Sequence, residues 1–170
     1  MAKLIFLNRK ERQKIFDSLE ECYGFSDSSI FDKYEILSKE KDDDSEKIFI
    51  LSKSVVELDF QNLRIDSMGL YFGEFKKGQF RLSIDGSHLI GKYCSKNVID
   101  LDRDQLNKYI SGEDVDFEYE NSFVLVRSGS DYFGSARIKD NVIINHMPKE
   151  RRVSSIIKSS EDEDENYLDI

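Results

Sequence analysis

Two helix-start signals, far apart along the chain, constrain its fold more than any other feature. Asn8 and Glu11 have the spacing of a capping box, in which two polar side chains satisfy free backbone N–H groups at a helix start. The same spacing recurs at Asp102 and Gln105. Each pair is followed by apolar residues at helical spacing and then by a glycine, where helices commonly end. The sequence therefore predicts two amphipathic helices, one opening each half of the chain.

Short strands accompany each predicted helix. In the first half the strand-like segments are residues 34–41, 47–51, 69–75 and 79–84, with a short helix after Ser54. In the second half they are residues 98–101, 122–127, 132–139, 142–145 and 153–157. This pattern predicts an α+β protein: an α/β domain over residues 1–96, then a mostly-β, barrel-like domain over residues 97–157.

The charge of the chain is unevenly distributed. Its net charge is −9, and residues 158–170 alone carry six acidic side chains against one lysine, a net of −5 that predicts a solvated, disordered tail. Residues 73–96 have five cations against two acids, and residues 127–153 have six against three, so each window carries +3. The total charge disfavours a simple polyanion binder, whereas the two windows allow a local anion-binding face or chance clustering on a solvated surface.

Several function classes lack their sequence signatures. Apolar runs such as residues 48–51 and 123–126 are four residues long, too short for a transmembrane span. The two histidines are isolated, and the glycines form neither a phosphate loop nor a dinucleotide fingerprint. We therefore expect no metal, no cofactor and no catalytic residues, so the chain is predicted not to be an enzyme. Cys22 and Cys94 fit reduced thiols in a cytoplasmic protein without membrane contact.

The segment from Asn145 to Val153 is the most informative part of the chain. Lys149, Arg151 and Arg152 lie within four positions of one another, directly after Pro148. If a strand begins at Arg151, the two arginines point to opposite faces, so that one can bind phosphate while the other stacks on a base or braces the domain. The alternative is an exposed basic edge strand that resists aggregation.

The second half resembles the PUA domain, a small RNA-binding pseudo-barrel, and in particular archaeal PUA proteins. The resemblance runs through residues 97–101, 109–115, 124–126 and 132–137, and ends at residues 145–153 with the sequence Pro-Lys-Glu-Arg-Arg-Val. It implies RNA binding along the face of the PUA helix and last strand. The implied RNA-binding residues are Lys149, Arg151, Arg152 and Lys158, with Arg137 and Lys139 from the adjoining hairpin.

The first half resembles the pre-PUA domain of Nip-seven-type ribosome biogenesis factors. The similar segments are residues 50–52, 67–75 and 79–84. Related two-domain proteins accompany RNA methyltransferases, so the resemblance implies a role in rRNA processing, ribosome biogenesis or RNA modification, with rRNA or tRNA as partner. A further RNA or protein contact is expected at the basic hairpin residues Lys76, Lys77 and Arg81.

Two functions remain open from the sequence. The favoured one is binding of structured RNA; the alternative is a protein-interaction adaptor that docks an RNA methyltransferase or an assembly factor and has little RNA affinity of its own. The acidic tail could also compete with RNA for the basic segment that it follows.

Overall fold

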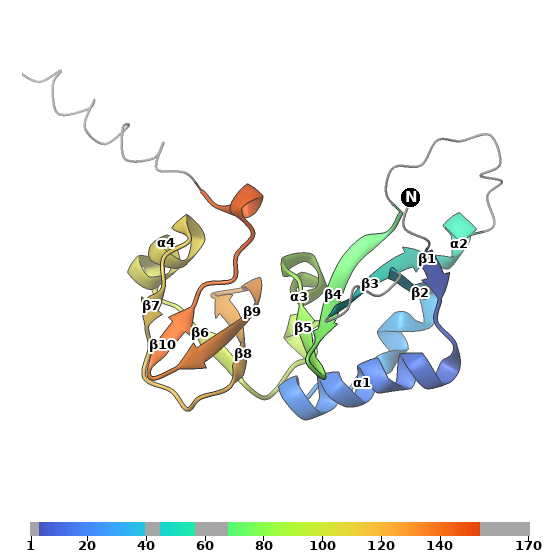
Figure 1. Ribbon diagram of the computed structural model, residues 1–170, viewed down its shortest axis with the longest axis horizontal. Coiled ribbons are helices and arrows are strands. Elements are labelled where there is room, and N and C mark those ends of the chain that lie inside the picture. The colour runs from blue at the N-terminus through green and yellow to red at the C-terminus, as the bar shows by residue number, and fades with distance from the viewer. Residues whose placement is uncertain (1–3, 40–44, 57–67, 154–170) are drawn as a thin grey trace, which may run out of the picture. The chain divides into compact units, whose positions relative to one another are not determined.

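The computed structural model describes residues 4–39, 45–56 and 68–153 (Figure 1). The chain divides into two compact units, the first made of residues up to 100 with residues 123–135, the second of residues 101–122 with residues from 136 onwards. The chain thus leaves the first unit after Asp100, returns to it for thirteen residues and leaves it again. The predicted domain boundary at residue 96 stays a prediction.

The first unit contains a five-stranded antiparallel sheet with strands in sequence order, β1-β2-β3-β4-β5. The strands are β1 (Leu4–Phe6), β2 (Tyr34–Lys39), β3 (Ser45–Ser52), β4 (Leu70–Lys76) and β5 (Gln79–Leu82). Its helices are α1 (Arg9–Tyr23), η1 (Ser28–Lys33), α2 (Lys53–Val56), α3 (Ile84–Ile90) and η2 (Gly91–Tyr93).

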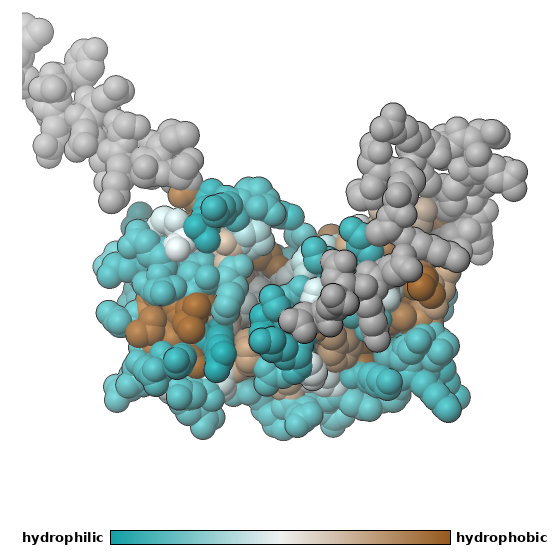
Figure 2. Space-filling model, viewed as in Figure 1, coloured by the Kyte–Doolittle hydropathy of each residue, from teal (hydrophilic) through white to brown (hydrophobic). Residues whose placement is uncertain are grey.

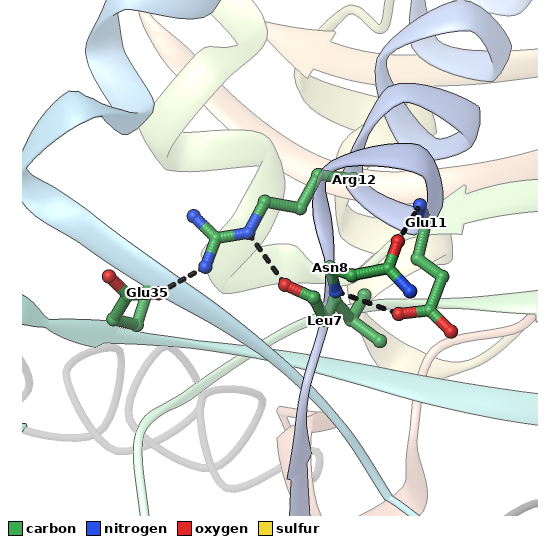
Figure 3. A network of polar contacts seen from close by, with 5 residues as sticks. All are labelled: Leu7, Asn8, Glu11, Arg12 and Glu35. Atoms are coloured by element: carbon green, nitrogen blue, oxygen red, sulfur yellow. Dashed lines mark hydrogen bonds and ion pairs between the residues drawn. The ribbon is translucent and has the colours of Figure 1, made fainter.

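The capping box predicted for the first helix is present at the start of α1 (Figure 3). The Asn8 side chain accepts from the Glu11 N–H at 3.1 Å, and the Glu11 carboxylate accepts from the Asn8 N–H at 2.7 Å. Arg12, in the first turn, donates from Nε to the Leu7 carbonyl at 3.0 Å and pairs with Glu35 on β2. These contacts fix the chain between β1 and α1, and the helix buries its apolar side from Ile15 onwards.

The second sheet has the order β6-β8-β9-β10-β7. Its strands are β6 (Val98–Asp100), β7 (Val115–Asp116), β8 (Phe123–Ser128), β9 (Asp131–Lys139) and β10 (Val142–Ile144), and α4 (Arg103–Ser111) follows β6. β6 runs parallel to β8, while β10 pairs antiparallel with both β9 and β7. The α+β class and the mostly-β character of the second half are therefore confirmed.

Two pairs of predicted strands, 69–75 with 79–84 and 132–139 with 142–145, form hairpins whose two-residue turns have left-handed backbone. Lys77 and Gly78 join β4 to β5 with φ of 51° and 79°, and Asp140 and Asn141 join β9 to β10 with φ of 54° and 63°. Positive φ at both central residues defines the type I′ turn, whose twist matches that of paired strands. Glycine, asparagine and aspartate enter this conformation most readily, so Gly78, Asp140 and Asn141 carry the sequence signal for these turns, whereas Lys77 does not.

The core of the first unit includes residues from the returning segment 123–135. Leu125 and Tyr132 lie in the same buried cluster as residues of α1 and the first sheet. Ser135 Oγ is 2.7 Å from the Tyr23 hydroxyl and accepts from the Leu82 N–H at 2.8 Å. Gly91 allows close packing, because a Cβ there would lie 2.5 Å from the Tyr132 ring. The segment is thus part of the packing of the first unit.

Several elements differ from the sequence-based expectation. β1, β7 and α3 were not predicted, and neither were η1 and η2. The chain does not begin a strand at Arg151, because Lys149–Arg151 forms a 3-10 helix, η3. Residues 154–157 of the predicted strand 153–157, and the whole predicted tail, lie outside the described residues. No helix in the described ranges is long and apolar enough to cross a membrane.

Candidate nucleic-acid interface

The candidate interface is built around helix α4, whose start and end follow directly from the sequence. The Gln105 N–H donates to the Asp102 side chain at 2.9 Å, and the Asp102 N–H donates to the Gln105 side chain at 3.1 Å. Tyr109 is the buried anchor of the helix. Gly112 ends it with φ of 94°, a conformation that glycine adopts without steric cost.

The segment after β10 contacts the C-terminal end of α4. Asn145 donates from Nδ2 to the carbonyls of Tyr109 and Glu113 at 2.6 and 2.9 Å, and its Oδ1 accepts from the Met147 N–H at 2.9 Å. The Val153 N–H donates to the Ile110 carbonyl at 3.0 Å. Carbonyls at a helix end lack partners within the helix, so these bonds both satisfy them and hold residues 145–153 in place.

The Arg152 side chain connects the segment after β10 to the end of α4. Its Nε donates to the Met147 carbonyl at 3.1 Å, and its side chain lies against Gly112, where a Cβ would come within 2.6 Å of it. A cation beside a helix C-terminus is also favoured by the helix dipole. Of the two roles that the sequence left open for the paired arginines, Arg152 therefore has the bracing one.

Lys149 and Arg151 are presented differently. Both are exposed on η3, which is closed by the Arg151 N–H donating to the Pro148 carbonyl at 2.9 Å. Lys108, which sequence reasoning missed, is exposed on the last turn of α4, the same turn whose Ile110 carbonyl binds Val153. The signal that could have found it is its position one turn before the helix-ending glycine.

Arg137 and Lys139 lie on one face of β9. They alternate with the buried residues Ala136 and Ile138, so both side chains are on the face away from the core of the second unit and both are exposed. Lys139 pairs with Val142 and Arg137 with Ile144 across the hairpin. Lys158, the remaining predicted RNA contact in this half, lies outside the described residues.

The basic hairpin of the first unit is only partly available. Lys77, at the turn, is exposed, whereas Lys76 and Arg81 are half-buried. The Arg81 guanidinium lies over the Phe123 ring at 4.8 Å, and its Nε is buried without a hydrogen-bond partner among the described residues. Arg81 therefore contributes to packing against the returning segment, and Lys77 is the most accessible cation of the three.

One arginine from the second basic window is neutralised. Arg127 on β8 donates from Nε to Asp100 on β6 at 2.7 Å and makes a second contact with the other carboxylate oxygen. Hydrogen bonding to Arg127 holds the pKa of Asp100 below its usual value. The pair is exposed and bidentate, so it fixes two parallel strands side by side.

Metal-ligating side chains and cysteines are two groups that could carry chemistry in the described part of the chain. No cluster of three or more histidine, cysteine or acidic side chains with metal-binding geometry occurs among them. Burial raises the pKa of Cys94 to about 12 and also raises the pKa of Cys22, so both are held as thiols rather than as nucleophilic thiolates.

Comparison with known families gives two separate matches. Residues 6–84 match the pre-PUA domain of NIP7/UPF0113, and residues 96–153 match the PUA domain of the methyltransferase RsmF. No curated protein matches the chain. The second match ends at Val153, the residue whose N–H binds the end of α4. The chain therefore has the architecture of a NIP7-type pre-PUA domain followed by a PUA domain that resembles the one in RsmF.

Proposed function

We propose that this protein binds structured RNA through its second unit and acts, without a catalytic group of its own, in rRNA processing, ribosome biogenesis or RNA modification. The observation that carries the proposal is the presentation of Lys149 and Arg151: both are exposed on a short helix that hydrogen bonds hold against the end of α4. A pre-organised pair of cations loses little entropy on binding. The proposed contacts are Lys149, Arg151, Lys108, Arg137 and Lys139.

The chemistry of these residues suits the RNA backbone. Arginine binds phosphate oxygens in a bidentate manner, and lysine neutralises phosphate as a point charge. The nearest helix-borne aromatic side chain, Tyr109, is buried and cannot stack on a base. The surface is therefore suited to phosphate and shape recognition of a folded RNA rather than to stacking of unpaired bases.

The alternative function is a protein-interaction adaptor. The second unit has eight cations against fifteen acids, a net of −7, which favours a partner other than a polyanion. Such an adaptor would dock an RNA methyltransferase or an assembly factor. Because Cys22 and Cys94 are both free thiols, we place either activity in the cytoplasm.

The test is a fluorescence-anisotropy titration of the full chain with a labelled RNA hairpin and a labelled single strand, at two salt concentrations. The variant Lys149→Ala/Arg151→Ala is compared with the matched control Lys10→Ala/Lys14→Ala, which removes two exposed cations from α1. We expect the first variant to weaken hairpin binding roughly hundredfold, about 2.7 kcal/mol. The slope of the logarithm of its affinity against the logarithm of salt concentration should become less steep, by the amount expected for the loss of about two phosphate contacts.

Equal losses in the two variants would show that binding follows total charge and would refute the assigned surface. Failure of the folded wild-type protein to bind either RNA at low salt would reject direct RNA binding and leave the adaptor.

A further inference from the structure

Strand β1 forms one edge of the first sheet and pairs, within the described residues, with β2 alone. The Leu7 N–H donates to the Ile36 carbonyl at 2.9 Å. In an antiparallel ladder the direction of the backbone groups alternates from residue to residue. Ile5 therefore directs its N–H and carbonyl toward β2, and Leu4 and Phe6 direct theirs away from the sheet.

The side chains of this edge are apolar and exposed. Ile5 is 48% and Phe6 51% exposed, the two highest values among the large hydrophobic residues that the structure describes. Figure 2 shows hydrophobic surface at the right of the view, where β1 lies in Figure 1. The strand contains neither proline nor a charged residue. Such an edge is an unprotected template for strand pairing.

The other sheet edges are protected in recognisable ways. At β5, Ser135 accepts the Leu82 N–H, and Arg81 places a charge on the strand. At β7, the strand is two residues long and one of them is Asp116. At β6, Asp100 is paired with Arg127. Since edge protection is the norm in this fold, the lack of it in the described part of β1 calls for a partner.

The charges after β1 indicate which partner. Arg9 and Lys10, which follow the strand at the start of α1, are both exposed. One acid of the same helix turn and one on the neighbouring strand β2 are already engaged, Glu11 in the capping box and Glu35 with Arg12 (Figure 3). A segment that lies along β1 thus meets a cationic end near Phe6.

We propose that β1 accepts an extended apolar segment of another protein as a sixth strand, with an acidic residue at the end beside Arg9 and Lys10. Backbone hydrogen bonds to Leu4 and Phe6 supply affinity, and alternate apolar side chains contact Ile5 on one face of the sheet and Phe6 on the other. This surface lies in the first unit and is independent of the RNA proposal.

The test uses the full chain, labelled with ¹⁵N, and the fluorescein-labelled peptide Glu-Val-Thr-Ile-Thr-Val-Glu. We expect saturable binding, with amide shift changes concentrated at Leu4 to Phe6. Ile5→Lys and Phe6→Pro should each weaken binding at least roughly tenfold. Phe6→Pro removes an outward N–H that β2 does not use, so it leaves the sheet intact. The control Leu70→Lys, at a residue 40% exposed on β4, should bind normally.

Two comparison peptides complete the test: one with proline at the central position and one with lysine at both ends. Both should bind more weakly than the acidic peptide. The proposal is overturned if the proline peptide binds equally well, if the shift changes lie elsewhere, or if no peptide binds. It is also overturned if sedimentation shows that the free chain pairs through β1 with a second copy.

Discussion

The two units of this protein differ in net charge, and the difference runs against their proposed roles. The first unit has seventeen cations and nineteen acids, a net of −2, whereas the second has eight cations and fifteen acids, a net of −7. Charge counting alone would therefore place an RNA surface on the first unit.

The units also differ in how some of their cations are used, although the first unit has exposed cations as well, such as Lys10 and Lys77. In the first unit Arg12 pairs with Glu35, Arg81 lies over Phe123, and Arg127 is bidentate with Asp100. In the second unit Lys149 and Arg151 are exposed on a helix that other residues hold in place. The comparison teaches that presentation of a few cations, and not the charge of the region, identifies a candidate interface.

The largest expected effect is a loss of stability in the first unit when a polar side chain that holds it together is removed. Ser135→Ala removes the acceptor of the Leu82 N–H and the shorter of the two contacts of the Tyr23 hydroxyl, which keeps the Phe80 carbonyl at 3.4 Å. We expect a loss of about 2 kcal/mol in the free energy of unfolding, because two buried polar groups lose a bond. Urea denaturation measures it, with the exposed Ser130→Ala as control. Equal stability of the two variants would mean that segment 123–135 is not integral to the first unit.

A smaller effect is expected for Arg152, which braces the segment after β10. Arg152→Ala removes the hydrogen bond to the Met147 carbonyl and the packing on Gly112. The free energy of unfolding should fall by about 1 kcal/mol, and RNA affinity should fall much less than in Lys149→Ala/Arg151→Ala. Thermal melting measures the change in stability, and fluorescence anisotropy measures the change in RNA affinity. If Arg152→Ala instead abolished RNA binding in a fully stable protein, Arg152 would be a ligand and the bracing role would be wrong.

The smallest effect is the pH dependence carried by Asp100. Its pKa is lowered in the folded protein by Arg127, so its stabilising contribution is complete above the unfolded pKa and disappears as the pH falls through the folded one. Because the pair is exposed, this contribution is roughly 0.3 kcal/mol. Urea denaturation of Asp100→Asn and wild type at pH 7 and pH 2.5 should show a difference at pH 7 only. A difference that persists at pH 2.5 would assign it to another cause.

Elements with local chemical signals were predictable from the sequence. The capping boxes at Asn8 and Asp102 lie where the helices begin, and the turns at Lys77-Gly78 and Asp140-Asn141 lie where the hairpins close. In the caps, a side chain satisfies a backbone group only a few residues away. In the turns, the residues adopt a backbone conformation that few residue types tolerate.

Elements that depend on distant contacts were not predictable. Glycine is a poor helix former, and yet α3 contains Gly86. The tight packing requires it, because a Cβ there would lie 2.1 Å from the Phe72 carbonyl oxygen. β1 is three residues long and exists by pairing with β2. The role of Arg152 is decided by Gly112, forty positions earlier in the chain. At the site, the sequence therefore indicated the residue types but could not separate a brace from an exposed cation.

The return of residues 123–135 to the first unit has a consequence for synthesis. A chain emerging from the ribosome presents α1 and the whole first sheet long before Leu125 and Tyr132 reach the core that they share. The helix α4 and β7 are made in between. The N-terminal unit therefore keeps part of its apolar interior open until residues 101–122 of the second unit have been translated. A nascent chain most needs a chaperone during this interval.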